Sequence, residues 1–209
     1  MNTNARITVE DANKLVSSVQ VAHRIAVGFY GRVLPMLDEI AGQLGLDFWY
    51  WGSEEDRVVP RGSTPPSSRW SWDFVPLYSS LHCYSRESGK NLASPTDVVL
   101  GLVLYIDDSF ERDGPVRAGS AHQPDPVSLP IGRAVLRTYV YRPRHDVPED
   151  LLTVWNKSAW VHPVGIWEIA SEYMMAIGRE WTLAEAISNP QAIVEFLKPH
   201  CDIDLELQV

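Results

Sequence analysis

Four carboxylates follow one another closely after an apolar run near the middle of the chain. Asp107 and Asp108 come directly after the run Val98 to Ile106, and Glu111 and Asp113 follow. Carboxylate oxygens hold Mg²⁺ or Ca²⁺, so Asp107, Asp108 and Glu111 are candidate ligands of a metal-assisted hydrolase or nuclease. The competing interpretation is a turn, since Asp side chains accept hydrogen bonds from backbone two residues on. Neighbouring side chains on an extended chain point apart, so we favour the turn and expect no cofactor.

Tryptophan is the second unusual feature, with eight in the chain. Four of them form two Trp-x-Trp units, Trp49/Trp51 and Trp70/Trp72. Residues two apart share one face of a strand, so paired strands would present four indoles to a base, a sugar or a protein partner. The alternative is that these indoles fill the core between a sheet and the N-terminal helix.

Negative charge is concentrated in the C-terminal part of the chain. Up to His145 there are 16 acids and 15 bases, a net charge of −1; from Asp146 onward there are 11 acids and 3 bases, a net charge of −8. Such a surface repels nucleic acid and membrane phosphates and attracts a basic protein. A solvated surface that only keeps the protein dissolved is the competing interpretation.

The loop-like stretch from Trp155 to His162 lies inside this acidic region and is the best candidate for an exposed aromatic patch. We expect Trp155 or Trp160 to anchor a partner, because Trp dominates the binding energy of protein interfaces. Glu149 and Asp150 are expected to steer that partner by long-range attraction.

The other reactive residues form no familiar catalytic motif. The sequence has no P-loop, GxGxxG, GxSxG, HExxH or zinc-ligand spacing, and its six histidines are scattered. His82 and Cys83 are neighbours in a strand-like run, so they lie on opposite faces and cannot act as base and nucleophile for each other. These absences favour a binding protein over an enzyme.

The N-terminal part of the chain is expected to form a long helix. Thr8 and Asp11 resemble a capping box, and the apolar residues that follow have the three-and-four spacing of a helix over residues 9–44. Pro35 is expected to kink or split this helix, and Gly45 to cap its end.

The helix is expected to lay its apolar stripe on a sheet that contains Trp49, Trp70, Val103 and Val135. Glycine costs helix stability relative to alanine, so Gly28 and Gly31 predict another element packed close to the backbone there.

Strand-like patterns occupy a sheet region, 46–142, and helical patterns occupy the acidic region 148–198. Expected strands are 46–51, 69–85, 98–106 and 133–142, with a tail strand at 203–208; expected helices are 149–156, 166–179, 183–188 and a last one opened by Asn189 and Pro190. The order lacks strict alternation of strand and helix. It predicts a single α+β domain over 1–209 with a mainly antiparallel sheet of about four to five strands.

The N-terminal sequence has no secretory signal, and nowhere are eighteen consecutive residues apolar. We therefore expect a cytoplasmic protein that makes no membrane contact and no direct nucleic-acid contact through its C-terminal region. The predicted function is a non-catalytic protein-binding module, a small acidic inhibitor or nucleic-acid mimic of bacterial or phage origin that docks on a basic partner.

Overall fold

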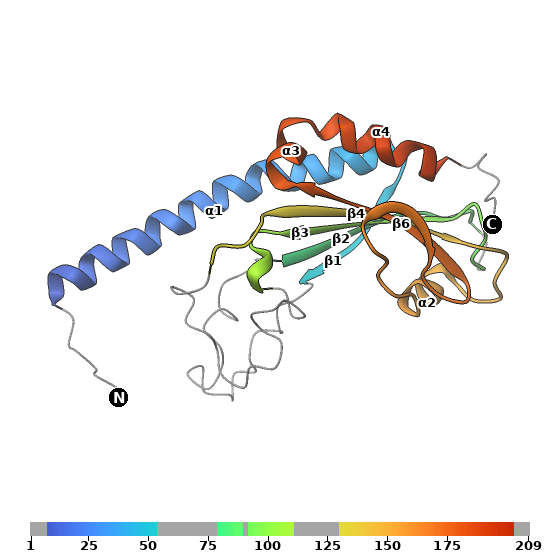
Figure 1. Ribbon diagram of the computed structural model, residues 1–209, viewed down its shortest axis with the longest axis horizontal. Coiled ribbons are helices and arrows are strands. Elements are labelled where there is room, and N and C mark those ends of the chain that lie inside the picture. The colour runs from blue at the N-terminus through green and yellow to red at the C-terminus, as the bar shows by residue number, and fades with distance from the viewer. Residues whose placement is uncertain (1–7, 54–78, 90–91, 111–129, 203–209) are drawn as a thin grey trace, which may run out of the picture.

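One six-stranded antiparallel sheet forms the centre of the protein (Figure 1). The computed structural model describes residues 8–53, 79–89, 92–110 and 130–202. The strands are β1 (Asp47–Ser53), β2 (Ser79–Arg86), β3 (Val98–Tyr105), β4 (Val135–Pro143), β5 (Val164–Ile169) and β6 (Met174–Thr182). Their order in the sheet is β1-β2-β3-β4-β6-β5. The α+β class is as predicted, with six strands where four to five were expected.

Helices lie on both faces of this sheet (Figure 1). They are α1 (Val9–Gln43), α2 (Leu151–Asn156), α3 (Leu183–Ser188) and α4 (Pro190–Cys201). The end of α1 packs with α3 and α4 on what we call the α4 face, over strand residues such as Leu102 and Leu136. α2 and its flanking segments cover the opposite face, the α2 face, with Val103 and Val135. The sheet on which α1 packs contains Trp49, Val103 and Val135, as predicted. Val103 and Val135 lie on the face away from α1, since neighbours in a strand alternate between faces.

The ends of α1 follow the predicted capping chemistry. The Thr8 hydroxyl accepts a hydrogen bond from the Asp11 backbone N–H at 3.1 Å and so begins the helix. At the other end Gly45 takes a positive φ of 66°, and the Leu46 N–H donates to the Ala41 carbonyl at 3.1 Å. Glycine adopts this left-handed conformation without the steric cost of a Cβ, which explains why the helix stops here.

Pro35 lies inside α1, and the helix is not split there. Val33 and Leu37, on either side of it, are completely buried in the core. The apolar area that this turn buries offsets the loss of one backbone hydrogen bond.

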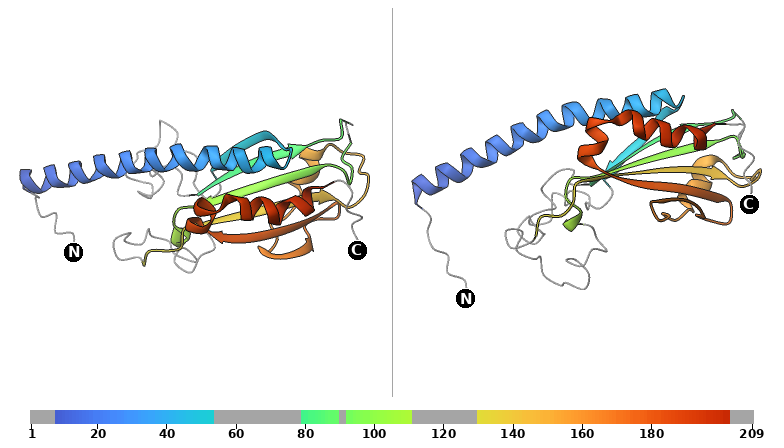
Figure 2. Two further views of the ribbon diagram at one scale, coloured as in Figure 1. Left: turned by 90° about the horizontal axis from the view of Figure 1, so that it is seen from above. Right: turned by 45° about the horizontal axis from the view of Figure 1, so that its top comes forward.

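The first two thirds of α1 extends beyond the sheet (Figures 1 and 2). We call residues 9–32 the arm; the buried residues of α1 all lie after it, from Val33 to Ala41. A β-carbon added at Gly28 or Gly31 would meet nothing within 4 Å. The prediction that another element packs closely against these glycines is therefore wrong for the part of the chain that the structure describes.

Residues 166–179 are strand and turn, where a helix was expected. Ser171 forms the turn between β5 and β6, because its hydroxyl accepts hydrogen bonds from the backbone of Tyr173 and Met174. β6 lies between β4 and β5 and buries residues on both faces, so its apolar run does not alternate as an exposed strand would. The helical region 148–198 therefore contributes two strands to the sheet.

The other elements lie close to their predicted places. β3 is buried along its whole length, as its continuous apolar run predicts. α3 occupies residues 183–188 and α4 begins at Pro190, although the Asn189 side chain makes no capping hydrogen bond. The predicted tail strand 203–208 lies outside the described residues.

A bulge in β1 changes the predicted Trp-x-Trp arrangement. The register between β1 and β2 shifts between Phe48 and Tyr50, so that Trp49 is the extra residue. Trp51 pairs with His82 on the α4 face, whereas Trp49 packs with the core of the α2 face. The two indoles therefore do not share a face, and Trp70 and Trp72 lie outside the described residues.

Within the described part of the chain, no helix has the length and apolar character needed to cross a membrane.

Candidate functional site

The indole of Trp160 lies on the α2 face of the sheet. Its ring centroid is 4.9 Å from that of Tyr139 and 6.0 Å from that of Tyr141, both in β4. A β-carbon at Gly101 in β3 would lie 3.6 Å from the indole. Trp160 is nevertheless 42% exposed. One part of the ring thus contacts the sheet while another part faces solvent.

The backbone on both sides of Trp160 is held by hydrogen bonds. The Ala159 N–H donates to the Ala170 carbonyl at 2.8 Å, and the Glu180 N–H donates to the Pro163 carbonyl at 3.2 Å. A side chain that is already fixed loses little conformational entropy when a partner binds. The backbone that carries Trp160 is therefore already ordered in the free protein.

Trp155, the other predicted anchor, is only 9% exposed. It packs edge-on against Trp49 and Tyr50, with ring centroids 5.9 and 5.6 Å away. It also lies edge-on to Trp160 at 6.4 Å. Trp155 thus supports the ring of Trp160 from below, and of the two tryptophans Trp160 is the one that a partner can contact.

The two predicted steering carboxylates each have a local structural partner. Asp150 caps α2, with its two oxygens accepting from the Thr153 backbone N–H and hydroxyl, both at 2.8 Å. The bond from the Thr153 backbone is the main reason that the pKa of Asp150 is lowered. Glu149 forms an ion pair with Lys157. Reversing either charge would therefore disturb α2 as well as the surface potential.

Exposed apolar side chains also lie along β5, which is an edge strand of the sheet. Val164, Ile166 and Ile169 are all exposed, and Leu152 is exposed on α2. Exposed strand edges pair readily with other chains. This edge strand was not predicted, because residues 166–179 were expected to be a helix. The β-branched residues at 164 and 166 are the signal that favours a strand.

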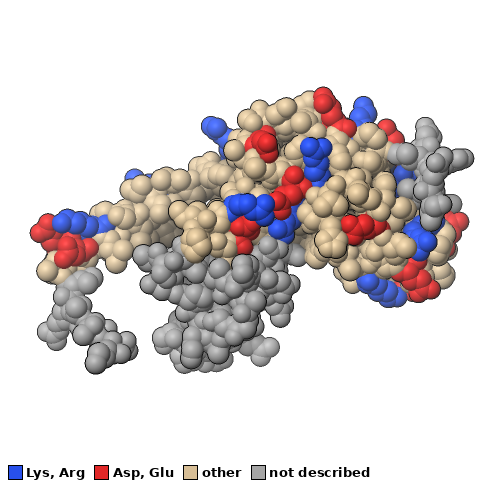
Figure 3. Space-filling model, in the orientation of Figure 1, with Lys and Arg blue, Asp and Glu red and all other residues tan. Residues whose placement is uncertain are grey.

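Charged side chains of both signs are mixed on one face of the molecule (Figure 3). On the face shown in Figure 3, Asp and Glu side chains alternate with Lys and Arg side chains, without a large area of one sign. Two carboxylates of the C-terminal region are exposed: Asp146, which precedes α2, and Glu172, which lies between β5 and β6. On this face the carboxylates therefore form no continuous row of negative charge.

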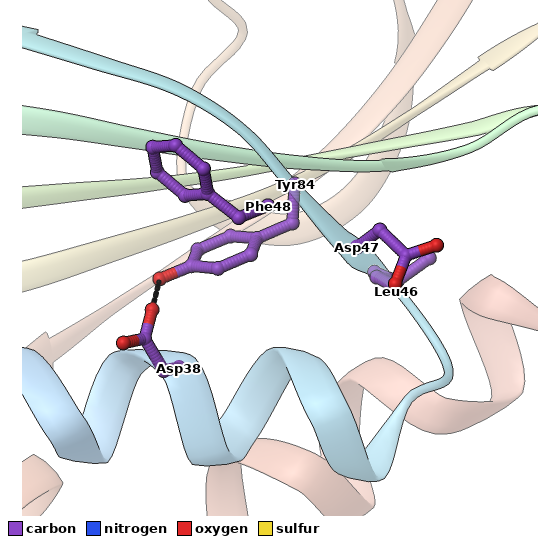
Figure 4. Close-up of a pocket in the computed structure, with 5 residues that line it drawn as sticks. All are labelled: Asp38, Leu46, Asp47, Phe48 and Tyr84. Atoms are coloured by element: carbon purple, nitrogen blue, oxygen red, sulfur yellow. Dashed lines mark hydrogen bonds between the residues drawn. The ribbon is translucent and has the colours of Figure 1, made fainter.

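A shallow pocket of about 420 Å³ lies between the end of α1 and strands β1 and β2 (Figure 4). It is lined by Asp38, Leu46, Asp47, Phe48 and Tyr84. The Tyr84 hydroxyl donates to Asp38 Oδ1 at 2.7 Å. Burial and then this hydrogen bond raise the pKa of Tyr84, so it stays a protonated donor. The Asp47 carboxylate points away from the pair, and the five lining residues include no nucleophile with an adjacent base (Figure 4).

Asp107 and Asp108 are held in turn interactions. Asp107 Oδ1 accepts from the backbone N–H groups of Ser109 and Gly132, at 3.0 and 2.9 Å. Asp108 binds the Arg133 backbone and guanidinium, at 2.7 and 2.9 Å. These contacts match the turn interpretation. Glu111 lies outside the described residues, and no three His, Cys, Asp or Glu side chains converge as metal ligands in the described ranges.

A serine and a histidine lie within hydrogen-bond distance on β2. Ser80 Oγ and His82 Nε2 are 3.0 Å apart. Both are buried, and burial lowers the pKa of His82. A substrate carbonyl has no access to the Ser80 hydroxyl in this arrangement. The pair therefore satisfies its own buried polar groups, as buried polar side chains usually do.

Comparison with known proteins gives one similarity. No curated protein and no solved structure matched the chain. Residues 9–202 match the PM0109 family, so the match includes the arm, the whole sheet and α4. The chain belongs to the PM0109 family.

Proposed function

We propose that this chain is a non-catalytic protein-binding module whose C-terminal region docks on a basic protein surface. The observation that carries the proposal is the position of Trp160, which is exposed yet fixed by the sheet beneath it. Large aromatic residues of this kind supply much of the binding energy of protein interfaces, because they bury a large area without ordering a flexible side chain.

The charge of the same region supports a basic partner. The net charge from Asp146 onward is −8, against −1 for the rest of the chain. Attraction between opposite charges speeds association, and it is screened over about 8 Å in physiological salt. Trp160 would thus set the lifetime of the complex and the carboxylates its rate of formation.

The described carboxylates give less support to a metal-assisted hydrolase that uses Asp107, Asp108 and Glu111. Asp107 and Asp108 direct their oxygens to backbone N–H groups and to Arg133. A metal ion would have to compete with each of those donors.

The proposal is tested by capturing a partner on the immobilised full-length chain and then measuring association and dissociation rates for variants. Trp160→Ala should raise the dissociation rate at least about tenfold, the loss typical of a central aromatic contact. Trp51→Ala is the matched control, since Trp51 is also exposed but lies in β1 at the other edge of the sheet. Equal effects of both substitutions would contradict the proposed surface.

The role of charge is tested at Glu172, which is exposed and caps no helix. Glu172→Lys should slow association and make it less sensitive to salt, while Glu39→Lys in α1 should change it less. An association rate that changes neither with salt concentration nor with Glu172→Lys would show that the negative charge serves only solubility.

The finer hypothesis of an inhibitor or nucleic-acid mimic is tested by competition. A double-stranded oligonucleotide that displaces this chain from its partner would indicate that the chain occupies a nucleic-acid site. Binding that the oligonucleotide does not affect would place the docking surface elsewhere on the partner.

A further inference from the structure

The arm carries an apolar stripe that contacts little of the described chain. Leu15 is 60% exposed and Val19 is 47% exposed. The arm also exposes Val9, Val16 and Ile25, which flank this stripe, and Val21 and Val27, which lie off it. An apolar surface of this length on a projecting helix is typical of an interaction site.

The stripe has the seven-residue repeat of a coiled coil. The a positions are Ala12, Val19, Ala26, Val33 and Ile40; the d positions are Leu15, Ala22, Phe29 and Met36. Val33, Met36 and Ile40 are buried against the rest of the protein, and Phe29 is partly buried. The same stripe thus runs from the core out onto the arm, where the described residues leave it largely exposed.

We propose that the arm pairs antiparallel with the arm of a second copy of this chain. This inference is independent of the docking surface at Trp160, which lies on the α2 face of the sheet. It rests on three properties of the arm: the sizes of the facing side chains, the flanking charges and the area available.

Side-chain size favours the antiparallel orientation. With the two-fold axis between Gln20 and Val21, Ala12 faces Phe29 of the second copy, Leu15 faces Ala26, and Val19 faces Ala22. Each layer then joins a large residue to a small one, so the layers have similar widths and the two helices stay evenly spaced.

The parallel orientation lacks this match. It would place each residue opposite its own copy, so Phe29 would face Phe29 and Ala22 would face Ala22. The layers at Ala12, Ala22 and Ala26 would then be narrower than those at Leu15, Val19 and Phe29, leaving voids at the alanines.

The flanking charges point the same way. In the antiparallel register Asp11 of each arm lies beside Arg32 of the other, which gives two pairs of opposite charge per dimer. In the parallel register Asp11 lies beside Val16 and makes no such pair. The small energy of an exposed ion pair serves here to select orientation rather than to hold the dimer together.

The geometry leaves room for the rest of both copies. We call the described residues outside the arm the body. At 1.5 Å per residue the arm is about 36 Å long, so the two bodies lie at opposite ends of the paired helices. Covering the exposed stripe on both arms would bury on the order of 1,000 Å², the lower end of the range for specific interfaces. A dimer that dissociates on dilution is therefore expected.

Sedimentation equilibrium of the full-length chain over about a hundredfold range of concentration tests the proposal. The wild type should pass from monomer to dimer. Val19→Glu should weaken the dimer at least about a hundredfold, because it places two carboxylates near the centre of the seam. Val27→Glu is the matched control: Val27 is 73% exposed but lies outside the seam, so the dimer should persist.

Disulfide formation tests the orientation, against the background of Cys83 and Cys201, which are both buried. Leu15→Cys combined with Ala26→Cys should cross-link two copies on oxidation, whereas Leu15→Cys alone should not. Cross-linking by Leu15→Cys alone would contradict the antiparallel register.

Two other results would overturn the dimer itself. One is a chain that stays monomeric at every concentration tested. The other is a lower melting temperature of the monomer after Val19→Glu but not after Val27→Glu. That result would mean that a segment of the same chain covers the stripe.

Discussion

The two parts of α1 share one helix and one apolar repeat, but they differ in what covers them. From Val33 to Ala41 the stripe is buried against the sheet and α4. From residue 9 to residue 32 the same kind of stripe projects from the body and is largely exposed (Figure 2). A heptad pattern thus identifies the face of a helix that will be covered, but not the molecule that covers it.

The largest expected difference between the two parts is in their contribution to stability. Leu37→Ala should lower the free energy of unfolding by about 2–5 kcal/mol, because Leu37 is completely buried. Leu15→Ala, the same substitution in the arm, should change it by less than about 0.5 kcal/mol when the protein is dilute. Urea unfolding at low protein concentration measures both. Similar losses would mean that the arm is also packed against its own body.

A smaller effect is expected at the arm glycines. A β-carbon at Gly28 meets nothing within 4 Å, so Gly28→Ala should stabilise the arm helix by about 0.5–1 kcal/mol. Slower amide exchange around residue 28 in the dilute protein would show it. Faster exchange would indicate that another segment approaches the backbone at this glycine.

The smallest expected effect is on the pH dependence of stability, which should come from the body and not from the arm. Burial lowers the pKa of His82 and of His200 from the ordinary value of 6.5. Below pH 6.5 the unfolded chain therefore binds protons that the folded chain does not, and the free energy of unfolding falls as the pH falls.

Replacing His82 by Gln should flatten that decline between pH 6.5 and more acidic pH. Replacing His23, which is exposed on the arm, by Gln serves as the control. Thermal unfolding in a series of buffers measures the slopes. Equal slopes for the wild type and His82→Gln would show that burial of His82 does not couple folding to protonation.

Local sequence chemistry predicted much of the fold. The cap at Thr8, the glycine that ends α1 and the continuous apolar run of β3 each depend on a few neighbouring residues, and each is confirmed. Residues 174–179 were assigned wrongly because β6, which is buried on both faces, has no alternation to distinguish it from a helix.

The candidate site was predicted less completely. The sequence singled out Trp160, but the ranking of Trp160 above Trp155 depends on the sheet that lies beneath both. The faces of Trp49 and Trp51 depend on a bulge, which shifts every later side chain to the other face. The spacing of residues in the sequence does not predict such long-range packing or shifts of strand register.

The most direct test of the account is amide hydrogen exchange along α1 as a function of protein concentration. In dilute protein the arm amides should exchange much faster than those from Val33 to Ala41, because their helical turns are not held by a core. At high concentration the arm amides should become protected, while those from Val33 to Ala41 stay unchanged. Arm amides that exchange equally fast at every concentration, or that are already protected in dilute protein, would contradict the account.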